Sequence, residues 1–143
     1  MQVTQVIDIE EALRVDLSAV YEAGGKTGFS FSATPIPPEL GEIPLDNVLV
    51  CIRRVGGTRN DLVVDTHSVA IDVYTTTWEE GISEADFLAG VISQLPYQSG
   101  MSIQYLTCSI ATTPYELPDA ENPIFPRVRM LVEIEAKASI IDF

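Results

Sequence analysis

The chain has 143 residues, with 8 basic against 21 acidic side chains and a net charge of −13. This length is typical of one domain with its own hydrophobic core, so we expect a single domain over residues 1–143. No apolar run approaches the roughly 20 residues that span a bilayer, and the first ten residues lack a secretory signal pattern. Proteins that grip duplex DNA neutralise its phosphates, so this acidity predicts no specific nucleic-acid binding and, at its simplest, provides solubility.

Residues 8 to 23 are predicted to form the first helix. Asp8 can cap it, Glu11 can reach back to the cap, and Gly24-Gly25 favours a left-handed ending. The main apolar stripe consists of Val6, Ile9, Leu13, Leu17, Val20 and Tyr21. A second stripe, separated from the first by Asp16, consists of Ala12, Val15, Ala19 and Ala23. The helix is therefore either buried on two sides within the domain, or packs its small residues against a neighbouring subunit.

The residues after this helix include a glycine-rich segment, Gly24-Gly25-Lys26-Thr27. A phosphate-binding loop needs a glycine where Val20 stands and a strand before it, so a helix terminus is the better interpretation. Phe29–Ser32 is expected to be a short edge strand. A long proline-rich loop follows at about 33–46, and loops of this length in compact domains are usually functional or mobile.

Two strands are predicted next, and they should pair as an antiparallel hairpin. The first covers Asn47–Val55 and is expected to end at Gly56-Gly57. The second, Thr66–Thr75, alternates with period two, as a half-buried strand does. Its inward residues are Val69, Ile71 and Val73, and its outward residues are Ser68, Asp72 and Tyr74.

The second helix is expected to follow a turn at Gly81. Ser83 is a natural N-cap, and Asp86 three residues later completes a capping-box variant. One face of the helix carries Ala85, Leu88, Val91, Ile92 and Leu95. Pro96 cannot donate the next backbone hydrogen bond and so ends the helix.

Two further strands close the chain, separated by a second proline-rich loop at about 113–126. In the first, Met101–Thr113, alternation sets Ile103, Tyr105 and Thr107 against Gln104, Leu106, Cys108 and Ile110. The last strand alternates most clearly, with Val128, Met130, Val132, Ile134 and Ala136 inward. Its outward residues are Arg127, Arg129, Glu133, Glu135 and Lys137, which are either solvated or paired across strands or subunits.

These elements predict an α+β fold. The sheet is expected to be mostly antiparallel, with four to five strands and two amphipathic helices packed on it, in the order α-β-β-β-α-β-β.

Residues that carry chemistry are few. His67, the only histidine, lies on the same side of its predicted strand as the inward residues Val69 and Ile71. This favours a hydrogen-bonded, partly buried side chain over a general base. Cys51 and Cys108 lie far apart, without C-x-x-C spacing, so we expect reduced thiols in or near the core and no zinc site. No nucleophile–base motif is present. From the sequence we therefore expect that the protein is not an enzyme, has no catalytic residue and binds no metal or cofactor.

Acidic and aromatic residues surround the start of the second helix. The pairs Glu79-Glu80 and Glu84/Asp86 lie where carboxylates favour the helix dipole, which explains them without a catalytic role. Trp78 either caps the core or serves as an exposed anchor for a partner.

The order and spacing of several short motifs carry a resemblance to a known family. They are Pro44, Arg54-Val55-Gly56-Gly57-Thr58, Val69–Tyr74, the acidic helix from Ser83, Pro114, Pro118, Pro126-Arg127 and the strand Val128–Ala138. In this order, and over nearly its whole length, the chain resembles the tail terminator proteins of long, non-contractile-tailed bacteriophages.

The resemblance implies a structural virion protein that needs no cofactor. Members of that family form a hexameric ring on the head-proximal end of the tail tube, stop its polymerisation and present the surface for head–tail joining. The implied partners are other copies of the chain, the tail tube protein and a head-completion or connector protein, with no membrane. The implied location is the virion tail, assembled in the host cytoplasm. Genome DNA would pass through the ring, where like charge discourages sticking.

Cations are scarce on this chain, so we expect them where acidic copies meet, since complementary charge fixes the register of an interface. The predicted interface residues are Arg53, Arg59, Trp78, Arg127 and Arg129. Three other functions stay open. They are a head–tail connector or completion protein of the same fold, a small cytosolic ligand-binding module or enzyme that uses the loops 35–44 and 113–126, and an inhibitor that mimics DNA.

Overall fold

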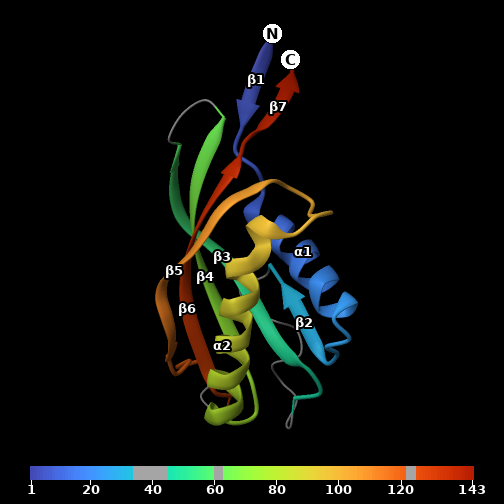
Figure 1. The fold of residues 1–143 in the computed structure, drawn as a ribbon. Coiled ribbons are helices and arrows are strands. Elements are labelled where there is room, and N and C mark those ends of the chain that lie inside the picture. Colours follow the sequence, from blue (N-terminus) through green and yellow to red (C-terminus); the bar gives the residue numbers. More distant parts are fainter. Residues whose placement is uncertain (34–44, 60–62, 122–124) are drawn as a thin grey trace.

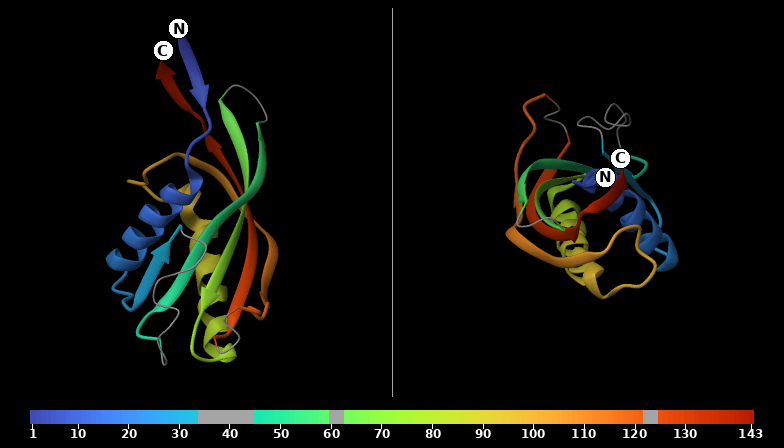
Figure 2. Two further views of the ribbon diagram at one scale, coloured as in Figure 1. Left: turned by 180° about the vertical axis from the view of Figure 1, so that it is seen from behind. Right: turned by 90° about the horizontal axis from the view of Figure 1, so that it is seen from above.

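The computed structural model describes residues 1–33, 45–59, 63–121 and 125–143. Within these ranges the fold is α+β, as predicted: a five-stranded sheet carries both α-helices on one face (Figures 1 and 2). A separate two-stranded ribbon projects from one end of the sheet. Most of the loop predicted at 33–46 lies outside the described residues. No helix in the described part is both long and apolar enough to cross a membrane.

The elements in chain order are β1 (Gln2–Gln5), α1 (Ile9–Ala23), β2 (Phe29–Ser32), β3 (Val48–Arg59), β4 (Val64–Tyr74), α2 (Trp78–Gln94), the 3₁₀ helix η1 (Leu95–Tyr97), β5 (Tyr105–Glu116), β6 (Arg127–Lys137) and β7 (Ser139–Asp142). The sheet order is β2-β3-β4-β6-β5. The pairs β3–β4, β4–β6 and β5–β6 are antiparallel, and β2 pairs with β3 in parallel. The predicted antiparallel hairpin of β3 and β4 is thereby confirmed.

Helix α1 begins and ends as its sequence predicts. Asp8 is the N-cap, and its Oδ1 accepts a hydrogen bond from the Glu11 amide at 3.1 Å. At the other end the Lys26 N–H donates to the Tyr21 carbonyl at 2.9 Å, as in a Schellman motif. Gly25 has a φ of 72°, the left-handed conformation that this motif needs.

Only one of the two α1 stripes is buried along the helix. In the main stripe, Ile9, Leu13, Leu17 and Tyr21 are at most 4% exposed. In the second stripe Ala12 is buried, whereas Val15, Ala19 and Ala23 are exposed. Within the described residues, burial of the helix on two sides is therefore wrong beyond its first turn. Packing of the small residues against a neighbouring subunit stays a prediction.

The main core lies between the helices and the sheet. All five inward residues predicted for β6 are at most 1% exposed, and they pack with Val69, Ile71 and Val73 of β4. The side chains of β4 that were predicted to face outward are less exposed than the alternation indicated. Asp72 and Tyr74 are buried, because a second cluster forms at that end of the sheet. Its buried members are Leu49, Cys51, Tyr74 and Phe125.

Strand β3 does not end at Gly56-Gly57, as predicted, but continues to Arg59. A β-bulge between Arg54 and Gly56 shifts the register with β4. A Cβ on Gly57 would lie 2.3 Å from the Thr66 carbonyl oxygen of the neighbouring strand. Gly57 therefore permits close approach of the two strands, and the glycine pair does not terminate the first one.

Helix α2 begins earlier than the predicted start at Ser83. Thr77 is its N-cap, and the Thr77 Oγ1 accepts from the Glu80 amide at 3.2 Å. Gly81 lies inside the helix and not in a turn. A glycine is needed there because the helix packs closely on the sheet. A Cβ on Gly81 would lie 2.8 Å from Thr75 Oγ1. The α-helix ends at Gln94, and Pro96 lies in the following η1, close to the predicted stop.

Strand β5 begins at Tyr105 and runs to Glu116, so both predicted boundaries move and the second proline-rich loop is shorter than 113–126. A register shift between Tyr105 and Thr107 breaks the alternation. As a result Tyr105 and Cys108, predicted on opposite faces, both pack against the main core. Strands β1 and β7 were not predicted at all.

Candidate functional site

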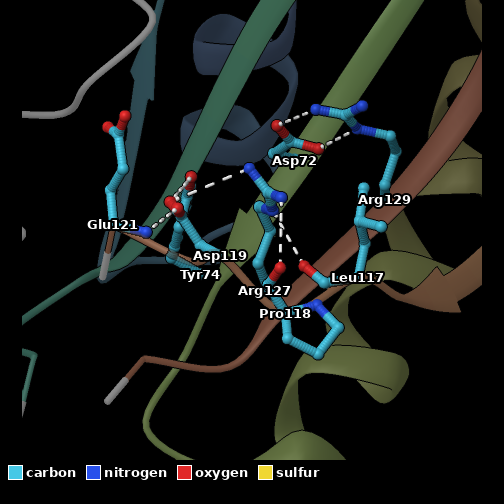
Figure 3. Close-up of polar contacts among 8 residues, drawn as sticks. All are labelled: Asp72, Tyr74, Leu117, Pro118, Asp119, Glu121, Arg127 and Arg129. Carbon is cyan, nitrogen blue, oxygen red and sulfur yellow. Dashed lines mark hydrogen bonds and ion pairs between the residues drawn. The ribbon is translucent and has the colours of Figure 1, made fainter. Parts of the chain in front are cut away.

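The face of the sheet opposite the helices carries an ion pair between the half-buried Arg129 and the buried Asp72. The two residues are directly opposed on β6 and β4. Arg129 Nε donates to Asp72 Oδ1 at 2.7 Å and Nη2 donates to Oδ2 at 2.9 Å, a two-pronged geometry that lysine cannot reproduce (Figure 3). The hydrogen bond to Asp72 raises the pKa of Arg129, so the guanidinium keeps its charge at any ordinary pH.

Arg127 holds the loop after β5 against the end of the sheet. Its Nε donates to the Leu117 carbonyl at 2.9 Å and its Nη1 lies 3.7 Å from Asp119 Oδ2 (Figure 3). The Tyr74 hydroxyl donates to the same Asp119 oxygen at 3.2 Å. Burial raises the pKa of Tyr74 to about 12, so its hydroxyl keeps the proton that this bond uses. The loop is thereby fixed over the second apolar cluster.

Arg59 connects the projecting ribbon to the sheet. Its Nε lies 3.0 Å from Oδ1 of the buried Asp65, at the far end of β4 from Tyr74. Its Nη1 donates to the Thr4 carbonyl at 3.3 Å and to the Thr4 hydroxyl at 3.2 Å. One guanidinium therefore bonds both β1 and the β3–β4 hairpin.

The other two predicted interface residues, Arg53 and Trp78, are half-buried. The β3–β4 register sets Arg53 beside Ala70, which places it on the same face as Arg127 and Arg129. Among the described residues its buried Nε has no hydrogen-bond partner. Trp78, at the start of α2, packs against the main core, which favours the core-capping alternative.

The five predicted interface residues thus do not form one patch. Arg53, Arg127 and Arg129 share a face, whereas Arg59 lies at the opposite end of the sheet and Trp78 on the helix side. Arg59, Arg127 and Arg129 each form an ion pair within the chain. Their contact with other copies stays a prediction.

The residues that could carry chemistry are buried or isolated. Cys51 and Cys108 are reduced thiols, as predicted, and burial raises their pKa values to about 11 and about 12. His67 is 0% exposed, and neither ring nitrogen has a hydrogen-bond partner within the described ranges, so the predicted hydrogen-bonded histidine is wrong there. The described residues contain no group of three or more His, Cys, Asp and Glu that could hold a metal ion.

The surfaces that stand out are apolar, and the first is the projecting ribbon, which we call the terminal ribbon (Gln2–Gln5 and Ser139–Asp142, with Phe143). Val3 and Ile141 are direct cross-strand partners and therefore share one face. They are 41% and 43% exposed, and Phe143 beyond them is 85% exposed. These side chains border a hollow of about 490 Å³. In the described structure β1 and β7 pair only with each other.

The second apolar surface is a groove beside the two helices, which we call the helix groove. It has a volume of about 410 Å³ and is lined mainly by Val20, Asp86, Phe87, Gly90, Val91 and Leu95. Phe87 is 49% exposed, and its ring lies edge-on to Tyr21 with centroids 5.8 Å apart. The Lys26 ammonium lies 4.3 Å from the Phe87 centroid, which fixes this wall of the groove.

Neither surface was predicted, although both left traces in the sequence. The run Ser139–Asp142 is β-branched at two positions, and Val3 stands between polar residues, but four-residue strands are too short for a clear period. The helix groove depends on how α1 and α2 meet, which the sequence does not specify. Compared with protein-family models and with curated protein sequences, the chain matches none.

Proposed function

We propose that this chain is a structural protein of a bacteriophage tail, a tail terminator. In this role it forms a ring, expected to be hexameric, on the head-proximal end of the tail tube. The ring stops tube polymerisation and offers the surface to which the head connector binds. The protein acts by binding copies of itself and the tube, and it makes or breaks no covalent bond.

The observation that carries the proposal is the terminal ribbon. A two-stranded ribbon is marginal by itself in water, and this one exposes apolar side chains on both strands. Arg59 nevertheless fixes its base to the sheet. Contiguous apolar side chains exposed in this way are typical of a protein–protein interaction site, as an assembly of copies requires.

The charge distribution also supports the proposal. The chain has eight cationic side chains, and five of them form ion pairs with its own carboxylates. The outer surface is therefore dominated by acidic groups such as Glu133 on β6 and Glu79 on α2. A ring built from such copies would present like charge to DNA that passes through it, which lowers retention of the DNA.

The proposal is tested by adding the purified chain to tail tube protein of the same phage while the tube polymerises. We expect elongation to stop at far fewer chains than tube subunits, with a ring visible by negative-stain microscopy at one end. An unrelated protein of similar acidity serves as the control for charge alone. Unchanged tube growth, with the chain bound nowhere on the tube, would rule the proposal out.

Tube length and binding to filled heads, measured with the same purified chain, distinguish a tail terminator from a head–tail connector or completion protein. A chain that leaves tube length unchanged but binds the portal side of filled heads would be a connector or completion protein. A stable monomer that binds a small molecule would favour the ligand-binding alternative.

A further inference from the structure

The terminal ribbon and the helix groove are two unpartnered apolar surfaces on different parts of one chain. We propose that the ribbon of one copy lies in the helix groove of the next copy. This inference deepens the proposed function and rests on it in one respect, because a closed ring requires one surface of each copy to meet a different surface of its neighbour.

The two surfaces match in length. Ser139 to Phe143 covers four strand steps, which is about 14 Å at the usual rise of a β-strand. Asp86 to Leu95 covers nine helical steps, which is also about 14 Å. The apolar face of the ribbon can therefore contact the groove over its full length.

The groove can accept a side chain from another copy because one of its lining residues, Gly90, has no side chain of its own. Gly90 is exposed on α2, and a Cβ added there would have no atom within 4 Å. Ile141 from a neighbouring copy can fill this space between Phe87 and Val91. Both surfaces are already held in place, because Arg59 bonds the ribbon and Lys26 contacts the Phe87 wall of the groove. Little conformational entropy is therefore lost when they bind each other.

Charge favours a second copy of this chain as the occupant and gives the contact a direction. Lys137 is exposed at the base of the ribbon, and Asp86 is exposed at one end of the groove. Neither side chain has an ion pair within the described ranges. A Lys137–Asp86 contact between copies would place the base of the ribbon at Asp86 and Phe143 toward Leu95. On a chain with so few free cations this pairing sets the register.

The ribbon cannot enter the groove of its own chain. The groove is lined by residues of α1 and α2 and of the segment after α2. Both side views show the ribbon projecting beyond the end of the sheet, away from these helices (Figures 1 and 2). Arg59 bonds both Asp65 and Thr4, so the ribbon base keeps this direction. The contact is therefore between copies, and it propagates from one copy to the next.

Two variants block one surface each. Gly90→Gln fills the groove with a side chain that suits a helix, and Gly90→Ala is its control because it adds only a methyl group. Val3→Thr with Ile141→Thr keeps the β-branched shape of the ribbon but removes the two apolar side chains that face each other across its strands. Gln2→Thr, on the other face of the same strand, is the control for this pair. Circular dichroism and urea unfolding establish that each variant folds.

The test is sedimentation velocity of each chain at rising concentration, up to about 1 mM. We expect wild type and both controls to self-associate, and each blocked variant to raise the apparent dissociation constant at least tenfold. A 1:1 mixture of the two blocked variants keeps one intact groove and one intact ribbon between them. It should therefore form a heterodimer that grows no further.

Other outcomes would overturn the inference. These are a wild-type chain that stays monomeric over the whole range, blocked variants that associate like wild type, or a mixture that yields no dimer. A charge reversal adds a second readout: Asp86→Lys and Lys137→Glu should each weaken association, and the double variant should restore it. If blocked variants still stop tube growth as wild type does, this interface is wrong although the terminator function stands. If wild type itself fails to stop tube growth, the proposed function fails separately.

Discussion

The hydroxyl of Tyr105 donates a 2.7 Å hydrogen bond to Oδ2 of Asp16, inside the protein and across 89 residues of chain. The same carboxylate accepts two bonds from Ser102, from its amide and its hydroxyl, each at 2.8 Å. Asp16 is only 2% exposed. Helix α1 is thereby joined to the segment that leads into β5. Burial and the bond to Asp16 raise the pKa of Tyr105, so its hydroxyl remains a donor.

Loss of this donor should weaken the whole fold. We expect Tyr105→Phe to lower the free energy of unfolding by about 1–2 kcal/mol, because a hydrogen bond to a buried charge is lost and the carboxylate keeps only two donors. Urea unfolding monitored by circular dichroism measures the change. Tyr97→Phe is the matched control, since Tyr97 is 79% exposed and should tolerate the same substitution. Equal stability of the two variants would contradict the role given to Asp16.

Two glycines of one helix should respond in opposite ways to the same substitution. Gly81→Ala places a methyl group 2.8 Å from Thr75 Oγ1 and 3.0 Å from Val128 Cγ2, so we expect a loss of about 1–3 kcal/mol in unfolding free energy. Gly90→Ala meets open space and should raise stability by up to about 1 kcal/mol through helix propensity. The same urea titrations measure both. A gain in stability for Gly81→Ala would contradict the packing of α2 on the sheet.

The Arg129–Asp72 pair should show strong coupling. We expect Arg129→Met to cost about 3 kcal/mol, because it leaves a buried carboxylate without its partner. Asp72→Ala in the same chain should recover much of that loss, and a double-mutant cycle measures the coupling. Arg14→Met is the control, since Arg14 pairs with Glu11 at the surface and should change stability little. Additive losses in the cycle would show that the two side chains do not act as a pair.

The stability of the protein should fall between pH 7 and pH 5 through His67. Burial, and then the charge of Arg54, lower the pKa of His67, with Asp65 opposing them. Its pKa in the unfolded chain is about 6.5, so below that pH the unfolded chain takes up a proton that the folded chain resists. The stabilisation is complete above about pH 6.5 and is lost as the pH falls toward the folded value.

His67→Leu should remove this part of the pH dependence. Leucine has a similar volume and leaves no unpaired ring nitrogen, so we expect stability at pH 7 to be equal to wild type or higher. His67 is the only histidine, so the difference between the two stability–pH curves isolates its contribution. Parallel curves from pH 7 to pH 5 would refute the account of His67.

The sequence predicted best those elements whose burial follows a single period. Strand β6 buries alternate residues from Val128 to Ala136 because helices cover one face along its whole length. Helix α1 was predicted at both ends because Asp8 and Gly25 act locally, through bonds to neighbours in sequence.

The errors arose where distant contacts decide. Thr77 and Ser83 each precede an acidic residue by three positions, and the sequence does not say which of the two is the cap. Gly81 looked like a turn residue, yet it is needed because α2 approaches Thr75 and Val128 closely. The start of β5 is delayed because Ser102 bonds to Asp16, 86 residues away.

The candidate surfaces were hidden for the same reason. The arginines were predicted at an interface from their scarcity, and that contact stays a prediction. What the sequence did not show is their partners on the same chain: the strand register brings Asp72 opposite Arg129, and the loop after β5 brings Asp119 to Arg127. The terminal ribbon unites residues from the two ends of the sequence, so its apolar face, Val3 beside Ile141, exists only once the chain is folded.

The most direct test of the proposed tail-terminator role is the position of the chain on assembled tail tubes. Labelled chain is added to growing tubes of the same phage's tube protein, and the label is located by electron microscopy with ring stoichiometry from image averages. The account predicts one ring of this chain at a single end of each tube, with no further growth at that end. Label distributed along the tube, or growth that continues past labelled ends, would contradict it.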